Sequence, residues 1–281
     1  MPKVSVVMPV HNTKEEYLRE SIGSILNQTF TDFEFIIIDD STTNAQENVI
    51  KIFNDERINY QKLESLSLAD ALNYGINLAK GQYIARMDAD DISLPTRFEK
   101  QVNFLETNID YSVIGSWFEI FPKQSIVKHI EMPKILDFFG ECCIGHPTVM
   151  FRKADFDKYK LRYENKYYCE DYDLWSRAVR YLNFYNIQEV LLYYRDNGEN
   201  RSYENNEQVV KDSENIRNNI LNILKTDENL PPKIKNLIIQ YPLPKLTLLQ
   251  KIFSIRCEFS GRKLYKVIRI LGLKISIKEE I

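Results

Sequence analysis

The first hundred residues alternate short apolar runs with stretches whose apolar residues recur at helical spacing. The apolar runs, such as FEFIIIDD at 33–40, are rich in β-branched residues and predict strands that are covered on both faces. The expected strands cover residues 3–8, 33–40, 58–63 and 83–88, and the expected helices lie around 18–26 and over 44–53, 67–79 and 95–106. This alternation predicts an open α/β sheet with right-handed crossovers.

Beyond residue 107 the alternation weakens. Strands are predicted at 111–121, 148–153 and 190–195, a helix at 170–182, and a polar helix at 204–225. We place a boundary near residue 203. This gives an α/β domain over 1–203, with halves 1–107 and 108–203, followed by a helical and basic C-terminal region over 204–281.

Charge is distributed unevenly along the 281 residues. The net charge is −3, which does not indicate a nucleic-acid-binding protein. Residues 245–278 carry nine Lys or Arg against one acid, so this segment is +8 and the remainder −11. Because its basic residues are interleaved with apolar ones, the segment is expected either to dock on an anionic membrane surface or to form a small module with a solvated basic face.

Cysteine spacing and hydropathy indicate the compartment. The four cysteines include no C-x-x-C pair, and adjacent Cys142 and Cys143 have poor disulfide geometry, so reduced thiols are expected. Neither a signal peptide nor an apolar stretch long enough to span a membrane is present. We therefore expect a cytoplasmic protein, peripheral at the inner face of the cell membrane if the basic segment docks there.

Polar residues gather where three of the predicted strands end. These clusters are Pro9–Asn12, Asp39–Ser41 and Asp88–Asp91. In open α/β sheets, ligands bind beyond the carboxyl ends of the strands. The coincidence predicts a binding cleft at this edge of the sheet.

Each acidic cluster has a structural and a functional interpretation. Asp39 and Asp40 suit either a helix cap or an acceptor for the N–H of a nucleobase or for a ribose hydroxyl. Asp88, Asp90 and Asp91 suit either a solvated loop or a Mg²⁺ or Mn²⁺ site in which a diphosphate completes the oxygen ligands. The D-A-D spacing alone is a weak signal.

Five segments together resemble glycosyltransferase family 2, the inverting nucleotide-sugar transferases of GT-A fold. They are VSVVMPVHN, SILNQTFTDFEFIIIDDST, LNYGINLAKGQYIARMDADDISLPTRFEKQ, HPTVMFRK and EDYDLWSRA. The resemblance covers roughly residues 3–195 in the family's order, and HPTVMFRK is similar to a block in members that build bacterial surface glycans. It implies an α/β, GT-A (Rossmann-like), mostly parallel open sheet flanked by helices.

The resemblance also implies roles for single residues at the donor site. The loop from Pro9 through His11 to Asn12 would line the nucleotide pocket, with His11 where the family usually has Tyr. Asp40 would bind the uracil edge. Asp88 would lie at the ribose or the metal, Asp90 would be the direct metal ligand, and Asp91 a supporting acid.

For the acceptor side, the resemblance implies that Asp171 is the catalytic base and that Glu170 orients it or the acceptor. Inverting transfer needs a carboxylate to take the acceptor's proton and a cation to stabilise the departing UDP. Asp173 is a rival for the base. In the absence of the family, all three acids would be favourable charges in the first turn of a helix.

Four further residues are candidates for the cleft. His146 is interpreted as a loop residue or as a contact to acceptor, metal or phosphate. Trp175, on the same helical face as Asp171, is either a sugar-site floor or a core residue. Arg97 and Gln101 share a helical face and are cleft-edge candidates.

Together these features predict a metal-dependent hexosyltransferase that moves a sugar from a UDP-sugar to a glycan or lipid-linked glycan in bacterial surface polysaccharide synthesis. HPTVMFRK favours a galactosyl or N-acetylhexosaminyl transferase. One alternative is a catalytically silent nucleotide-binding or scaffold relative, against which the intact Asp90 and Asp171 argue. Another is a nucleotidyltransferase, which usually has a Gly-rich or basic triphosphate loop that VMPVHNTKEE lacks.

Overall fold

The computed structural model describes residues 1–196, 198, 206–226, 253–260, 263–270 and 273–279. The chain divides into two compact units, Met1–Ile220 and Leu221–Ile281. The second unit thus begins further along the chain than the boundary predicted near 203. Each unit is described by itself.

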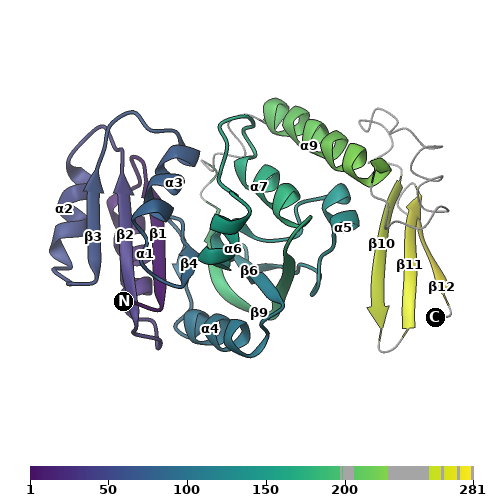
Figure 1. Ribbon diagram of the computed structural model, residues 1–281, viewed down its shortest axis with the longest axis horizontal. Helices are drawn as coiled ribbons and strands as arrows, with labels where there is room; N and C mark the ends of the chain where they lie inside the picture. Colours follow the sequence, from purple (N-terminus) through teal and green to yellow (C-terminus); the bar gives the residue numbers. More distant parts are fainter. Residues whose placement is uncertain (197, 199–205, 227–252, 261–262, 271–272, 280–281) are drawn as a thin grey trace. The chain divides into compact units, whose positions relative to one another are not determined.

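The first half of unit 1 alternates strands and helices as predicted (Figure 1). Its elements are β1 (Val4–Val10), α1 (Glu15–Leu26), β2 (Phe33–Asp39), α2 (Ala45–Ile52), β3 (Ile58–Lys62), α3 (Leu68–Leu78) and β4 (Tyr83–Arg86). These strands lie in the order β3-β2-β1-β4, and all their pairings are parallel. The carboxyl ends of β1, β2 and β4 therefore meet at one edge of the sheet.

The second half of unit 1 continues the same sheet with mostly antiparallel pairings. Its elements are β5 (Ile92–Ser93), α4 (Arg97–Thr107), β6 (Tyr111–Phe121), β7 (Ser125–Val127), α5 (Ile135–Gly140), a 3₁₀ turn (His146–Thr148), β8 (Met150–Arg152), α6 (Lys153–Lys158), α7 (Glu170–Ala178) and β9 (Asn183–Arg195). The full order is β3-β2-β1-β4-β8-β6-β9-β5, with β7 beside β6. In this half β6 and β9 are parallel, while β8 runs antiparallel to both β4 and β6.

Alternate residues of β1 face different layers of helices. Val4, Val6, Met8 and Val10 belong to the core cluster that includes buried residues of α1, α2 and α4. Val7 faces α3, where a Cβ on Gly75 would lie 2.5 Å from its Cγ1. Helices thus cover both faces of the parallel strands, which explains their nearly continuous apolar sequence.

Gly81 lets the turn before β4 approach β1 closely. A Cβ at this position would lie 2.6 Å from the backbone nitrogen of Ser5, a distance that real Cβ atoms essentially never show. The Gly81 N–H donates to Ser5 Oγ at 2.8 Å. The turn is therefore fixed against the neighbouring strand.

The chain beyond β9 contains α9 (Asn206–Thr226), which agrees with the predicted polar helix, and three strands. β10 (Phe253–Ser260), β11 (Lys263–Ile270) and β12 (Leu273–Glu279) form an antiparallel sheet in that order. The C-terminal region is thus partly β and not only helical. The side chains of the basic segment 245–278 lie outside the described residues, so membrane docking stays a prediction.

The remaining sequence expectations concern the cysteines and the hydropathy of the helices. Cys142, Cys143 and Cys169 are free thiols, as expected. Among the residues that the structure describes, none of the helices is long and apolar enough to cross a membrane.

Candidate active site

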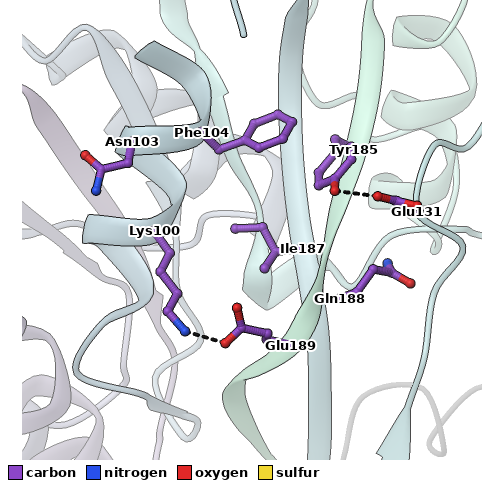
Figure 2. Close-up of a pocket in the computed structure, with 8 residues that line it drawn as sticks. All are labelled: Lys100, Asn103, Phe104, Glu131, Tyr185, Ile187, Gln188 and Glu189. Carbon is purple, nitrogen blue, oxygen red and sulfur yellow. Dashed lines mark hydrogen bonds and ion pairs between the residues drawn. The ribbon is translucent and has the colours of Figure 1, made fainter. Parts of the chain in front are cut away.

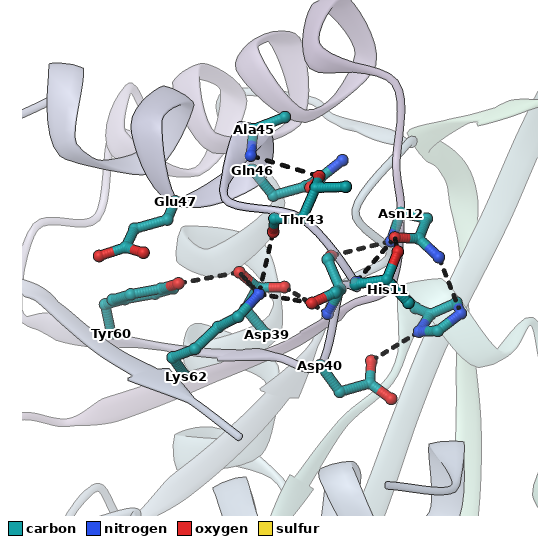
Figure 3. A network of polar contacts seen from close by, with 12 residues as sticks. His11, Asn12, Asp39, Asp40, Thr43, Ala45, Gln46, Glu47, Tyr60 and Lys62 are labelled. Carbon is teal, nitrogen blue, oxygen red and sulfur yellow. Dashed lines mark hydrogen bonds and ion pairs between the residues drawn. The ribbon is translucent and has the colours of Figure 1, made fainter. Parts of the chain in front are cut away.

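The loops after β1 and β2 are joined by side-chain hydrogen bonds (Figure 3). His11 Nδ1 lies 2.9 Å from Asp40 Oδ1, and the Asn12 N–H donates to Ser41 Oγ at 2.8 Å. The Asn12 side-chain oxygen accepts from the N–H and hydroxyl of Thr42, both at 3.0 Å. The first two polar clusters predicted from the sequence therefore form one surface, as expected for parallel strand ends.

Asp39 and Asp40 are adjacent but have different environments. Asp39 is completely buried and accepts from the Ser41 N–H at 2.8 Å, from the Tyr60 hydroxyl at 2.8 Å and from Lys62 at 3.2 Å. Burial raises the pKa of Asp39, but the hydrogen bonds from Ser41, Tyr60 and Lys62 outweigh it and leave the pKa below its usual value. Asp39 thus holds the loop in place.

Asp40, whose side chain is 12% exposed, remains the candidate to meet a nucleobase. Pro9 in β1 is also partly exposed.

Sequence reasoning did not identify Tyr60 and Lys62. Their position at the carboxyl half of β3, beside β2, was the available signal.

The acidic loop (Asp88–Asp91) follows β4 at the same edge of the sheet. Asp88 and Asp90 are partly exposed, whereas Ala89 and Asp91 are buried. Burial and the charge of Asp88 raise the pKa of Asp90 to about 6. Burial and the charges of Asp88 and Asp90 raise the pKa of Asp91 well above its usual range. The loop therefore carries more negative charge than its protein surroundings neutralise.

Such a charge excess suits a divalent cation. The buried Asp91 Oδ2 has no hydrogen-bond partner among the described residues, and Asp88 and Asp90 present oxygen ligands of the kind that Mg²⁺ and Mn²⁺ prefer. Across the described part of the chain, no group of three His, Cys, Asp or Glu side chains is arranged to hold a metal ion. The loop thus fits a cation bound by one or two carboxylates and completed by a diphosphate and water.

Arg86, at the end of β4, is buried and forms an ion pair with Asp88. Burial lowers the pKa of Arg86, but Asp88 outweighs it and the pKa lies above its ordinary value. This residue, which the sequence reasoning missed, offsets part of the loop's charge from beneath.

Helix α7 presents the second acidic motif. Asp173 is buried and pairs with Arg177, whose Nε donates to its Oδ2 at 2.9 Å. Glu170 is buried, while Asp171 is partly exposed. Burial raises the pKa of Asp173 although Arg177 opposes the shift. Asp173 is thus buried and engaged by Arg177, whereas Asp171 is partly exposed and accepts from the N–H of Tyr172 at 2.7 Å.

Tyr163, which the sequence reasoning did not identify, precedes α7 in the chain, and its ring packs edge-on against Trp175 of that helix. Its side chain is buried, and burial raises its pKa while the charge of Arg86 opposes the shift. Asp171 and Glu170 from α7 raise the pKa further, as does Asp88 from the acidic loop. The charges of both motifs thus act on the pKa of this one buried hydroxyl.

His146 is 9% exposed, and its Nε2 lies 2.8 Å from the hydroxyl of Tyr163. Trp175 has no exposed surface, and its ring packs edge-on against His146, Phe151 and other aromatic rings. Trp175 is therefore a core residue and not the floor of a sugar site. His146 touches the site through Tyr163.

Arg97 and Gln101 are also core residues and not cleft-edge residues. Arg97 has no exposed surface and donates to the Arg86 carbonyl at 2.7 Å, and Gln101 donates to the Thr148 carbonyl at 2.7 Å. Burial and the charge of Arg86 lower the pKa of Arg97 to about 9. Arg97 thus holds the backbone at the end of β4, and Gln101 holds that of the 3₁₀ turn.

A separate open pocket of about 540 Å³ lies between α4 and β9 (Figure 2). Two of its polar contacts join lining residues to one another: the Tyr185 hydroxyl donates to Glu131 at 2.6 Å, and Lys100 forms an ion pair with Glu189. None of the predicted site residues lines it.

Comparison with known proteins gives the family. Residues 5–160 match the model of glycosyl transferase family 2. The chain is 40% identical over 207 residues to an uncharacterised glycosyltransferase of Methanocaldococcus jannaschii, covering 69% of this chain and 71% of that one. It is 38% identical over 205 residues to the O-antigen biosynthesis glycosyltransferase WbnJ of Escherichia coli, covering 68% and 79%.

Solved structures agree on the fold. S. aureus TarS in complex with UDP-GlcNAc has a TM-score of 0.66 at 16% identity, covering 84% of this chain and 70% of that one. The mannosyltransferase PcManGT from Pyrobaculum calidifontis, in complex with GDP-Man and Mn²⁺, has a TM-score of 0.59 at 14% identity, covering 85% and 68%. The sequence matches and the geometry agree: the chain belongs to glycosyltransferase family 2 and has the GT-A fold.

Proposed function

We propose that this glycosyltransferase moves a sugar, with inversion, from a UDP-sugar to a hydroxyl of a glycan or lipid-linked glycan, with Mn²⁺ or Mg²⁺ bound at the acidic loop. The observation that carries the proposal is the acidic loop at the carboxyl edge of the sheet, where Asp88 and Asp90 are partly exposed beside a buried Asp91 whose Oδ2 has no hydrogen-bond partner among the described residues. A cation site and a carboxylate base facing one region are what single displacement at an anomeric carbon needs.

The donor half of the site would be built by the strand ends. The loop with His11 and Asn12 would receive the nucleoside, and Asp40 would accept from the base N–H. Asp88 and Asp90 would hold the cation, which supplies charge stabilisation for the departing diphosphate. The buried Asp39 keeps the backbone of the loop after β2 fixed before the donor arrives.

The acceptor half would be built by α7. Asp171 takes the proton of the acceptor hydroxyl as that oxygen bonds to the anomeric carbon. The bond from this carbon to the UDP oxygen breaks, and its electron pair leaves with UDP. Glu170 would orient the base or the acceptor, and Asp173 keeps the helix in place through Arg177.

One relative supports a role in surface polysaccharide synthesis, and a second supports the transferase activity alone. WbnJ is named for O-antigen biosynthesis, and a 35% identical protein of Bacillus subtilis is named a putative glycosyltransferase, EpsE. The structural neighbours bind different donors, UDP-GlcNAc in TarS and GDP-Man in PcManGT. A carboxylate such as Asp40 accepts from the N–H of uracil or of guanine, so the nucleotide has to be tested directly.

The test is thermal unfolding with UDP, GDP, dTDP and CMP, each with and without Mn²⁺. A ligand at 100 times its dissociation constant stabilises the folded state by about 2.7 kcal/mol. We expect stabilisation by UDP that requires Mn²⁺ and disappears in Asp90→Ala. Stabilisation by none of the nucleotides would refute the donor site and favour the scaffold relative. Stabilisation by GDP alone would replace the UDP-sugar with a GDP-sugar as the proposed donor.

A further inference from the structure

Arg195, the last residue of β9, contacts the acidic loop through both its backbone and its side chain. Its N–H donates to Asp91 Oδ1 at 2.9 Å, and its Nε donates to the carbonyl oxygen of Asp90 at 2.7 Å. The residue is 8% exposed. Two consecutive residues of the loop are thus held by one arginine that lies more than a hundred positions away in the sequence.

The guanidinium group is itself held by α1. It forms an ion pair with Glu20 and lies 4.3 Å from the centre of the Tyr17 ring. Helix α1 also contacts the acidic loop directly, since Ser21 Oγ donates to the carbonyl oxygen of Asp88 at 2.7 Å. Side chains from α1 and β9 therefore fix the carbonyl groups of both Asp88 and Asp90.

This arrangement opposes the tendency of the loop to spread. The three carboxylates within these four residues repel one another. Asp91 is buried, whereas Asp88 and Asp90 are partly exposed, so repulsion would push the two exposed carboxylates apart. The bonds to the backbone carbonyls of Asp88 and Asp90 do not use the carboxylates of these residues, of which that of Asp88 pairs with Arg86. Groups that orient metal ligands in this way typically contribute about 10- to 100-fold in metal affinity.

We propose that Arg195 is a positioning residue for the divalent cation, which fixes the acidic loop so that Asp88 and Asp90 meet the metal together. The inference rests on the proposed function. The positioning role requires an arginine, because the planar guanidinium donates from Nε to the Asp90 carbonyl while another of its nitrogens pairs with Glu20. A lysine keeps the charge but ends in a single ammonium on a flexible stem.

The experiment uses the full chain as wild type, Arg195→Lys and, as a matched control, Arg19→Lys. Arg19 is exposed on α1 beside Glu20. Mn²⁺ affinity is measured without nucleotide from the electron paramagnetic resonance signal of free Mn²⁺. UDP affinity is measured at saturating Mn²⁺, and each variant is melted.

We expect Arg195→Lys to weaken Mn²⁺ binding about 10- to 100-fold, with UDP affinity at saturating Mn²⁺ unchanged and Arg19→Lys equal to wild type. Unchanged Mn²⁺ affinity, with or without a lower melting temperature, would show a role confined to folding and overturn the inference. Weaker UDP binding at saturating Mn²⁺, together with normal Mn²⁺ affinity, would place Arg195 on the donor and also overturn the inference.

Glu20→Gln keeps the inference testable if Arg195→Lys does not fold. This change removes the charged carboxylate that pairs with the Arg195 guanidinium, and the Glu20 side chain is 54% exposed. We expect a loss of Mn²⁺ affinity of several-fold, smaller than that of Arg195→Lys, and no loss would contradict the inference. If wild type binds no Mn²⁺ either alone or with UDP, the proposed metal dependence fails first. If wild type binds Mn²⁺ and the variants match it, only the role of Arg195 fails.

Discussion

Exchanging the two aspartates of α7 one at a time separates the proposed base from its structural neighbour. Asp173→Asn removes the carboxylate that Arg177 binds at 2.9 Å, in a side chain that is 6% exposed. Asp171→Asn removes the partly exposed carboxylate that the proposed mechanism uses as proton acceptor. The two changes are chemically identical and lie two positions apart.

The magnitudes follow from the contacts. A hydrogen bond to a charged group contributes about 1.5–3 kcal/mol. Arg177 is 25% exposed and also donates to the Arg162 carbonyl at 2.8 Å, so we expect Asp173→Asn to cost about 1–2 kcal/mol in unfolding free energy. For a unit of this size that corresponds to a fall in melting temperature of about 2–8 °C. We expect turnover within about tenfold of wild type.

Asp171→Asn should behave in the opposite way. Removing a general base typically lowers kcat about 10²- to 10⁴-fold. Because its carboxylate is partly exposed, we expect stability within about 0.5 kcal/mol of wild type. UDP and Mn²⁺ binding should be unchanged, since neither contacts the base in the proposed mechanism.

The assay is UDP release from a UDP-sugar without acceptor, in which water takes the acceptor's place, together with thermal unfolding of each variant. Equal UDP-dependent stabilisation of both variants is the control for an intact donor site. If Asp173→Asn abolished turnover at normal stability while Asp171→Asn remained active, the base would be Asp173 and the assignment from burial and pairing would be refuted.

Three further predictions test the loops and the sheet. Burial and Asp88 raise the pKa of Asp90 to about 6, so the stability of the metal-free protein should fall as the pH rises from about 4 to 6. For the same reason, Mn²⁺ affinity should fall close to tenfold for each pH unit below about 6 in titrations from pH 5 to 7.5. A Mn²⁺ affinity that does not change with pH would contradict the raised pKa. Asp39→Asn replaces one oxygen of the buried carboxylate that accepts three hydrogen bonds with an NH2 group, which cannot accept, so it should cost about 2–3 kcal/mol in urea unfolding. Wild-type stability would contradict the role of this network. Gly81→Ala should cost about 2 kcal/mol or more because the new Cβ meets the backbone of Ser5, whereas a change below 0.5 kcal/mol would show that the turn moves freely.

The sequence was sufficient for the parallel half of the sheet and for the edge where the site lies. Continuous apolar runs predict strands covered on both faces, and parallel strands bring their carboxyl ends together. The clusters at Pro9–Asn12 and Asp39–Ser41 accordingly share hydrogen bonds. The antiparallel second half was less readable because β9 begins with Asn183 and contains polar residues between its apolar ones.

Depth within the fold was not readable from spacing. Trp175 lies one helical turn from Asp171, and spacing places both on one face of α7. The helix runs from the site into the core, so Asp171 is partly exposed while Trp175 is fully buried. Arg97 was misplaced for the same reason, since a charged residue near a helix start usually faces solvent and this one satisfies buried carbonyls.

Supporting residues from distant elements had no sequence signal of their own. Tyr163 precedes α7 in a loop, and Arg195 ends a strand with an unremarkable composition. Each acts through a contact between elements that are far apart in sequence, to His146 in one case and to the acidic loop in the other. Such contacts depend on tertiary packing, which one sequence does not specify.

The bond between His11 and Asp40 makes a prediction about nucleotide selection. His11 Nδ1 lies 2.9 Å from Asp40 Oδ1, and its ring is 63% exposed, whereas Asp40 is 12% exposed. The ring therefore both orients the carboxylate and lies where a base would approach it. His11→Phe keeps a flat ring and removes the hydrogen bond.

If the bond orients Asp40 for the uracil N–H, His11→Phe should weaken UDP binding about fivefold, which corresponds to about 1 kcal/mol for one hydrogen bond. Asp40→Asn should weaken it about 10- to 100-fold because the charged acceptor is lost. In the double variant the loss from His11→Phe should vanish, since its effect passes through Asp40. The measurement is UDP and GDP affinity at saturating Mn²⁺. Tighter UDP binding by His11→Phe would show instead that the imidazole competes with the base for Asp40, so that donor binding must first break this bond.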